Sequence, residues 1–141
     1  MNTSARPSLK SLQLCLVAFA IASLVHFVHN AEFLKEYPGL PESWTSTTVY
    51  GAWLALSAVG LIGWLAMRAG YAVIGLVLLG GYAAGGMDSL GHYWVAPWSA
   101  HSTAMNLTIA LEVGTATLLF IDVLRRLVLR MQTARVVRGS V

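Results

Sequence analysis

The apolar residues of this chain fall into four long blocks, separated by short polar segments. The blocks cover residues 9–28, 49–67, 71–87 and 104–124. Each block is close to the ~20 residues that an α-helix needs to cross the ~30 Å hydrocarbon core of a bilayer. The connections between the blocks are brief and leave no room for a second domain. The pattern therefore predicts an all-α protein, a single integral membrane four-helix bundle over residues 1–141.

Turn-forming residues set the expected helix boundaries. Pro38, Gly39 and Pro41 end the first helix and make residues 31–48 a loop. Residues 68–70, Arg-Ala-Gly, join the second and third helices as a tight antiparallel hairpin. We expect helices at about residues 9–30, 47–67, 71–93 and 101–124, followed by a tail over residues 125–141.

Charge supports the membrane assignment and orients the bundle. Hydrophobic residues make up 57% of the chain and charged residues only 11%, which is too few charges for a soluble globular domain. Arg6, Lys10 and Arg68 flank the spans on one side, and the arginines of the tail follow the last span on that same side. The positive-inside rule then places both termini in the cytoplasm, with the lipid bilayer of a bacterial inner membrane as the surroundings.

The tail has the spacing of an amphipathic helix. Leu127, Val128 and Met131 alternate with Arg126 and Arg130 at helical intervals. A basic amphipathic segment directly after a membrane span is typical of contact with anionic lipid. We therefore expect the tail to bind the membrane surface and expect no nucleic-acid partner.

All four histidines of the chain are predicted to lie at one level of the bundle. His26 and His29 fall near the end of the first helix, His92 near the end of the third, and His101 at the start of the fourth. Because neighbouring helices are antiparallel, these positions meet on the outer, periplasmic side of the membrane. Random placement would scatter the histidines between both sides, so the distribution indicates an outward-facing polar site.

Helical spacing places carboxyl and amide groups beside these histidines. Residues three or four apart share a helix face, which pairs Asp88 with His92. On the last helix the same rule predicts a polar stripe that runs inward from His101 to Glu112. Ionisable residues at membrane depth are costly and are candidates for function. Further polar or sulfur-bearing candidates are Asn30, Glu32, Met105 and Asn106.

Imidazole and carboxylate together form the donor set of zinc, iron and copper sites. We therefore predict a transition-metal cofactor (Cu, Zn or Fe), in a membrane metalloenzyme or in a metal-binding subunit of an oligomer or larger complex. Met105 beside His101 favours copper. Asp-x-x-x-His followed by a histidine on the next helix is also similar to a copper-using membrane monooxygenase subunit. The predicted donors are His26, His29, Asp88, His92 and His101.

Two other functions fit the same residues. In an acid–base enzyme, an isomerase or cyclase acting on a lipid-soluble substrate, Asp88 or Glu112 would be the catalytic carboxyl with a histidine partner. In a proton or cation carrier, or an accessory subunit, the Glu112 stripe would relay the ion from outside. Haem b is less favoured, because carboxyl groups crowd a pocket that would need one histidine from each of two helices.

The segment HNAEFLKEYPGLPESW, residues 29–44, resembles a known group of proteins. Small four-helix bacterial membrane proteins with an HxxEE motif end their first helix in a similar way and continue into a proline-containing loop. His29 and Glu32 match the first part of that motif, whereas Phe33 stands in place of the second glutamate. The resemblance implies the four-helix layout and no particular activity.

Overall fold

The computed structural model describes residues 8–139, with side chains up to residue 135. Within these bounds the chain is helical and contains no strand. Arg6 and the side chain of Arg138, which entered the charge prediction, lie outside the described residues. The elements in order are α1 (Leu9–Glu32), η1 (Leu34–Glu36), α2 (Ser46–Arg68), α3 (Ala72–Met87), η2 (Asp88–Gly91), α4 (His92–Val95), η3 (Trp98–Ala100) and α5 (Thr103–Gly139).

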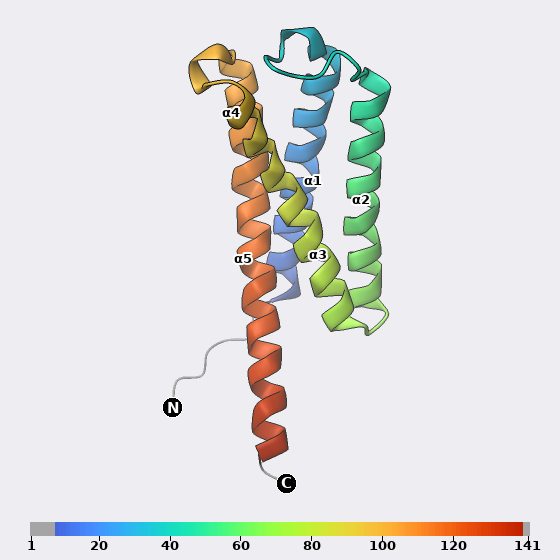
Figure 1. Cartoon of the computed structure of the whole chain (residues 1–141). Helices are drawn as coiled ribbons and strands as arrows, with labels where there is room; N and C mark the ends of the chain where they lie inside the picture. The colour runs from blue at the N-terminus through green and yellow to red at the C-terminus, as the bar shows by residue number, and fades with distance from the viewer. Residues whose placement is uncertain (1–7, 140–141) are drawn as a thin grey trace.

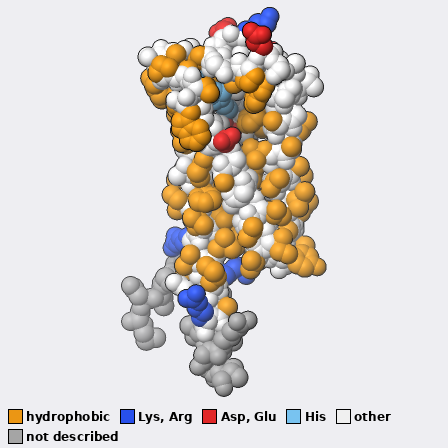
Figure 2. Space-filling view, viewed as in Figure 1, with side chains coloured by type: hydrophobic (Ala, Val, Ile, Leu, Met, Phe, Trp, Pro, Cys, Tyr) orange, Lys and Arg blue, Asp and Glu red, His pale blue; other side chains and the backbone are white. Residues whose placement is uncertain are grey.

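The predicted all-α class with four long helices is confirmed. In the described part of the chain, four helical segments are long and apolar enough to cross a membrane: Leu9–Glu32, Ser46–Arg68, Ala72–Val95 and Thr103–Arg135. Figure 2 shows hydrophobic side chains covering the sides of the bundle, with Lys and Arg side chains below this belt. Such a surface is suited to contact with lipid.

The two ends of the bundle differ in character. One end, here the loop end, carries the segment between α1 and α2 and the segment from η2 to η3 (Figure 1). The other, here the terminal end, carries the start of α1, the 69–71 turn and the extension of α5 (Figure 1). All four histidines belong to elements that meet at the loop end.

The half of the bundle near the terminal end is a hydrophobic core. Phe19 of α1 packs on Tyr82 of α3 with ring centroids 4.5 Å apart. A Cβ on Gly86 would lie 2.4 Å from the Phe19 ring and 3.1 Å from Ala116 Cβ, so glycine lets α3 fit between α1 and α5. The buried members of this core are Leu12, Phe19, Leu76, Leu79, Tyr82, Ala83, Ala116, Leu119 and Val123.

The start of α1 is fastened to α5 by a buried arginine. Arg126 Nη2 donates to the backbone oxygen of Ser8 at 2.6 Å and to Ser11 Oγ at 2.9 Å. Its Nε donates to Asp122 Oδ2 at 2.9 Å. Arg126 was expected on the polar face of an amphipathic tail, and the structure instead buries it between α1 and α5.

The tail is a continuation of α5 rather than a separate segment. α5 runs without interruption from Thr103 to Gly139, whereas the sequence prediction ended this helix at residue 124. The physical reason is that residues 115–138 contain neither Gly nor Pro, so nothing breaks the backbone hydrogen bonds there.

The close contact of α2 with α3 depends on glycine. A Cβ on Gly75 would lie 2.6 Å from Gly63 O and 2.7 Å from Met67 N, both backbone atoms that cannot move aside cheaply. A Cβ on Gly81 would meet nothing within 4 Å.

We predict that Gly75→Ala lowers the free energy of unfolding by about 1–3 kcal/mol, measured by reversible unfolding in detergent. Gly81→Ala is the matched control and should change stability by less than about 0.5 kcal/mol. Equal effects of the two variants would contradict this packing.

Candidate functional site

A buried histidine and a buried glutamate form the centre of the polar region near the loop end. His26 on α1 is 2% exposed and Glu112 on α5 is fully buried. His26 Nε2 lies 3.6 Å from Glu112 Oε2. That carboxyl oxygen also accepts a hydrogen bond from Ser89 Oγ at 2.5 Å. The site is therefore shared between α1, η2 and α5.

The hydrogen bonds around His26 determine how many protons the pair holds. Thr108 Oγ1 donates its single proton to the Met105 carbonyl at 3.0 Å. His26 Nδ1, 3.2 Å from Thr108 Oγ1, must therefore be the donor in that contact. In neutral His26 this leaves an acceptor at Nε2, facing the carboxyl group. One proton shared by His26 and Glu112 then makes the pair neutral, either as imidazole and carboxyl or as imidazolium and carboxylate.

The neutrality of the His26–Glu112 pair matters because the sequence offers no Lys or Arg near it. No Lys or Arg occurs between residues 69 and 124, and Lys35 in the loop is the sole one between residues 11 and 67. A lone carboxylate buried in an apolar helix bundle would be strongly unfavourable. The imidazole of His26 is thus the group able to compensate Glu112.

The predicted third helix is interrupted at the site. One helix was expected over about residues 71–93, but the α-helix ends at Met87 and continues as the 3₁₀ turn η2 and the short helix α4. A 3₁₀ turn has about three residues per turn, so residues three apart share a face. Ser89 is thereby aligned with His92, and Asp88 is rotated about a third of a turn away from it.

Asp88 is therefore offset from His92 around the 3₁₀ turn, whereas α-helical spacing had predicted a shared face, but its carboxylate still interacts electrostatically with His92. Asp88 is exposed, whereas Ser89 and His92 are half-buried. Ser89, which sequence reasoning missed, contacts Glu112 instead. The catalytic and metal-binding roles suggested for Asp88 stay predictions.

His92 links His26 to His101. Its ring centroid is 5.5 Å from that of His26 and 6.2 Å from that of His101. Asn30 Nδ2 donates to His92 Nε2 at 3.4 Å, and Asn30 Oδ1 is buried without a partner in the protein. Three of the four histidines thus have neighbouring rings.

His101 lies outside the helix in which it was predicted. Its backbone is extended (φ −94°, ψ 142°), and α5 begins only at Thr103. Ser102 caps α5, because Met105 N donates to Ser102 Oγ at 3.2 Å. His101 Nδ1 donates to the Pro97 carbonyl at 3.1 Å, while its Nε2 is buried without a partner.

Two of the secondary candidates, Met105 and Asn106, form hydrogen bonds with nearby backbone and side-chain groups. Met105 Sδ accepts from Ser102 N at 3.4 Å. Asn106 Nδ2 donates to the carbonyls of Trp98 and His101, each at 3.3 Å, and Asn106 Oδ1 accepts from Tyr93 at 2.9 Å. Asn106 therefore braces the connection between α4 and α5.

Tyr37 connects the buried pair to the surface. It lies in the loop between α1 and α2, is 4% exposed, and its hydroxyl interacts with the Thr108 side chain. The same hydroxyl lies 2.9 Å from His29 Nδ1. Burial raises the pKa of Tyr37 to about 12, so its phenol stays protonated at physiological pH. Half-buried His29 thus joins the site through Tyr37 rather than by contacting His26.

Six buried side-chain polar atoms in the described residues have no partner at full hydrogen-bond geometry within the protein, although the Ser23 hydroxyl still interacts with Glu112 and the Ser57 hydroxyl with Tyr82. All of them belong to residues between the middle of the bundle and its loop end, and none lies in the hydrophobic core. They are Ser23 Oγ, Asn30 Oδ1, Trp53 Nε1, Ser57 Oγ, His101 Nε2 and Glu112 Oε1. Unpartnered buried polar atoms are rare in proteins and call for an explanation.

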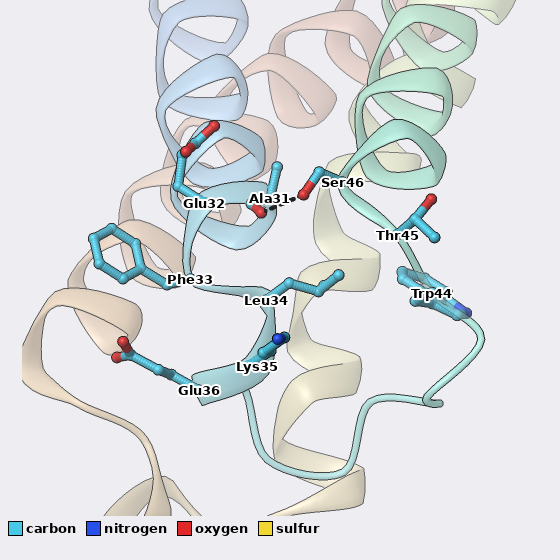
Figure 3. A pocket seen from close by; sticks show the side chains of 9 residues that line it. All are labelled: Ala31, Glu32, Phe33, Leu34, Lys35, Glu36, Trp44, Thr45 and Ser46. Atoms are coloured by element: carbon cyan, nitrogen blue, oxygen red, sulfur yellow. Dashed lines mark hydrogen bonds between the residues drawn. The ribbon is translucent and has the colours of Figure 1, made fainter.

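A separate groove of about 440 Å³ lies at the tip of the loop end. Its lining comes from residues 31–36 and 44–46 and contains no histidine (Figure 3). The hydrogen bond from Ser46 Oγ to the Ala31 carbonyl, 2.8 Å long, closes one side of it (Figure 3). Glu32 is exposed here and accepts from Tyr50 at 2.9 Å. Glu32 therefore ties α1 to α2 and stands apart from the buried pair.

The predicted metal donors do not converge as a ready coordination sphere. Among the described residues, no group of three or more His, Cys, Asp or Glu side chains is arranged to hold a metal ion. Part of the reason is that Asn30 occupies His92 Nε2 and Tyr37 occupies His29 Nδ1.

Comparison of the chain with protein-family models, curated proteins and solved structures gave no match. The resemblance to HxxEE proteins therefore stays a prediction.

Proposed function

We propose that this chain is an integral membrane protein with an acid–base site in its outer half, centred on Glu112 and His26. Both termini would lie in the cytoplasm and the loop end would face the periplasm of a bacterial inner membrane. The charges support this orientation, since Lys10, Arg68 and Arg125 are at the terminal end. The basic extension of α5 would then meet anionic lipid headgroups.

The observation that carries the proposal is the buried pair of His26 and Glu112, whose Nε2 and Oε2 atoms lie 3.6 Å apart. Transfer of the shared proton from carboxyl to imidazole converts two neutral groups into an ion pair without changing the net charge of the site. An acid or base of this kind can protonate or deprotonate a bound molecule at low energetic cost, because its partner compensates the charge. Glu112 Oε1, buried without a partner, is the atom available for that exchange.

A chain of polar groups supplies protons to this pair from the loop end. From Glu112 it runs through His26 and Thr108 to Tyr37 and ends at half-buried His29. Each member carries a group that can both accept and donate a proton. Protons can pass along this chain once the Thr108 hydroxyl turns from the Met105 carbonyl toward His26 Nδ1 and that nitrogen has released its own proton.

The packing favours an enzyme over a carrier. A carrier needs a polar route to both sides of the membrane. On the terminal side of Glu112 lies the hydrophobic core, where Leu76, Leu79 and Leu119 are fully buried. We therefore assign acid–base catalysis, of the kind an isomerase or cyclase performs on a lipid-soluble substrate.

Proton exchange at Glu112 tests this proposal. The infrared carboxyl band of Glu112 is identified by its loss in Glu112→Gln, and its rate of exchange is followed after transfer to D₂O. Tyr37→Phe removes the hydroxyl that links Thr108 to His29, so exchange should slow about tenfold or more. Tyr93→Phe is the matched control, because the Tyr93 hydroxyl bonds to Asn106 outside the chain. Exchange that is equally fast in Tyr37→Phe, or the absence of a Glu112 band at any pH, would contradict the proposal.

A metal-dependent function is the second candidate, favoured by the row of rings from His26 through His92 to His101 and by the unpartnered Nε2 of His101. Small rotations of His92 away from Asn30 would offer imidazole nitrogens to one ion.

This candidate predicts one equivalent of Cu, Zn or Fe in the purified protein and its loss in His92→Ala, measured by elemental analysis. Cys15→Ser, in the half near the terminal end, should keep the metal. Traces of metal that are the same in all three proteins would rule this candidate out.

A further inference from the structure

The unpartnered atoms include groups on α2, a helix that contributes nothing to the proton chain. Trp53 Nε1 is buried without a partner. An indole N–H can only donate, so an acceptor is the one kind of group that satisfies it. Glu112 Oε1 and Asn30 Oδ1 are likewise buried and unpartnered. A donor and two acceptors thus remain unsatisfied in one half of the bundle.

The register of the helices places Trp53 at the depth of Glu112. The hydrogen bond between Ser46 and Ala31 aligns the start of α2 with the end of α1. Trp53 follows Ser46 by seven residues, so it lies ~10 Å deeper at ~1.5 Å per residue. His26, the partner of Glu112, precedes Ala31 by five residues and lies ~8 Å deeper by the same rise. The indole N–H and the carboxyl group are therefore within about one helical turn in depth.

Because α3 turns away from α2, the bundle is open between α2 and η2 at the depth of Trp53 and Glu112. Gly85 still packs on Leu56 of α2, but the next residue, Gly86, packs on Phe19 and Ala116 of α1 and α5. Beyond that point η2 runs along α5, whereas α2 continues beside α1 (Figure 1). Figure 2 shows histidine surface in a recess on the side of the molecule, between hydrophobic side chains and above an acidic one. The recess opens sideways, at the height of the hydrophobic belt.

We propose that a neutral, membrane-dissolved alcohol or ketone reaches the site through this lateral opening between α2 and η2. Its oxygen accepts from Trp53 Nε1 at the level of Glu112, and its apolar body extends toward the bilayer. The inference rests on the acid–base function proposed above, for which it names the substrate class and the route of access. Trp53 is a positioning residue in this scheme.

Charge argues for a neutral oxygen group on the ligand. A phosphate or carboxylate headgroup would need a cation, and the sequence places Lys35 alone between residues 11 and 67 and no Lys or Arg between residues 69 and 124. Lys35 is exposed and lines the groove at the tip of the loop end. A hydroxyl or carbonyl oxygen satisfies the indole donor without adding charge, and a hydroxyl can also donate to Glu112.

Photoaffinity labelling of the protein in phosphatidylcholine nanodiscs tests the inference. The probe is a long-chain ketone that carries a diazirine, and labelled residues are mapped by mass spectrometry. We expect adducts on α2 and η2–α4 that an unlabelled long-chain alcohol suppresses and a long-chain alkyl phosphate leaves in place. Trp53→Phe keeps an aromatic ring but loses the donor, so labelling should fall about three- to tenfold. Trp64→Phe, on the same helix near the terminal end, is the matched control.

Labelling that the alkyl phosphate suppresses equally, or that is spread evenly over all lipid-facing helices, would overturn the inference. Unchanged labelling in Trp53→Phe would do the same. The competition series uses the unaltered protein and does not depend on how any variant folds. Loss of specific labelling with normal carboxyl exchange would reject this ligand class alone. Specific labelling with no sign of Glu112 exchange would reject the acid–base function alone.

Discussion

The constraint on which the rest of this structure depends is the burial of Glu112 among apolar helices without a cation beside it. A carboxyl group in such surroundings is tolerable when a partner can share its charge. His26 supplies that partner, because its Nδ1 is committed to Thr108 and its Nε2 is left facing the carboxyl group. The one-proton pair explains how two titratable groups persist in the centre of a bundle that is otherwise hydrophobic.

The architecture divides into two halves around this pair. Toward the terminal end, glycine allows α3 to pack tightly against α2 and then against Phe19, which closes the core to polar groups. Toward the loop end, the change from α3 to a 3₁₀ turn brings Ser89 to Glu112 and His92 to His26. Under the proposed function, the closed half blocks a route across the membrane, and the open half provides the proton chain and the lateral opening. This division is the reason for proposing catalysis rather than transport.

Much of this arrangement follows from the sequence, and the exceptions have physical reasons. Hydropathy alone predicts the spans, and antiparallel order brings His26, His92 and His101 together. Helical periodicity fails where the helix is not an α-helix. It pairs Asp88 with His92, whereas in the 3₁₀ turn Asp88 is exposed and Ser89 contacts Glu112. Tyr37 could not be found by periodicity, because a loop residue has no predictable direction; its position beside two prolines was the only signal. The role of Trp53 could not be predicted either, since the absence of a partner for its N–H is visible only in three dimensions.

The most direct test of the account is a double-mutant cycle between His26→Phe and Glu112→Gln, measured as free energies of unfolding in detergent. If the two side chains share one proton, each single variant removes the group with which its partner exchanges that proton. The coupling free energy should then be about 1 kcal/mol or more, with the double variant less destabilised than the sum of the single ones. A coupling within about 0.3 kcal/mol of zero would show that the two groups act independently, and the central claim would be wrong.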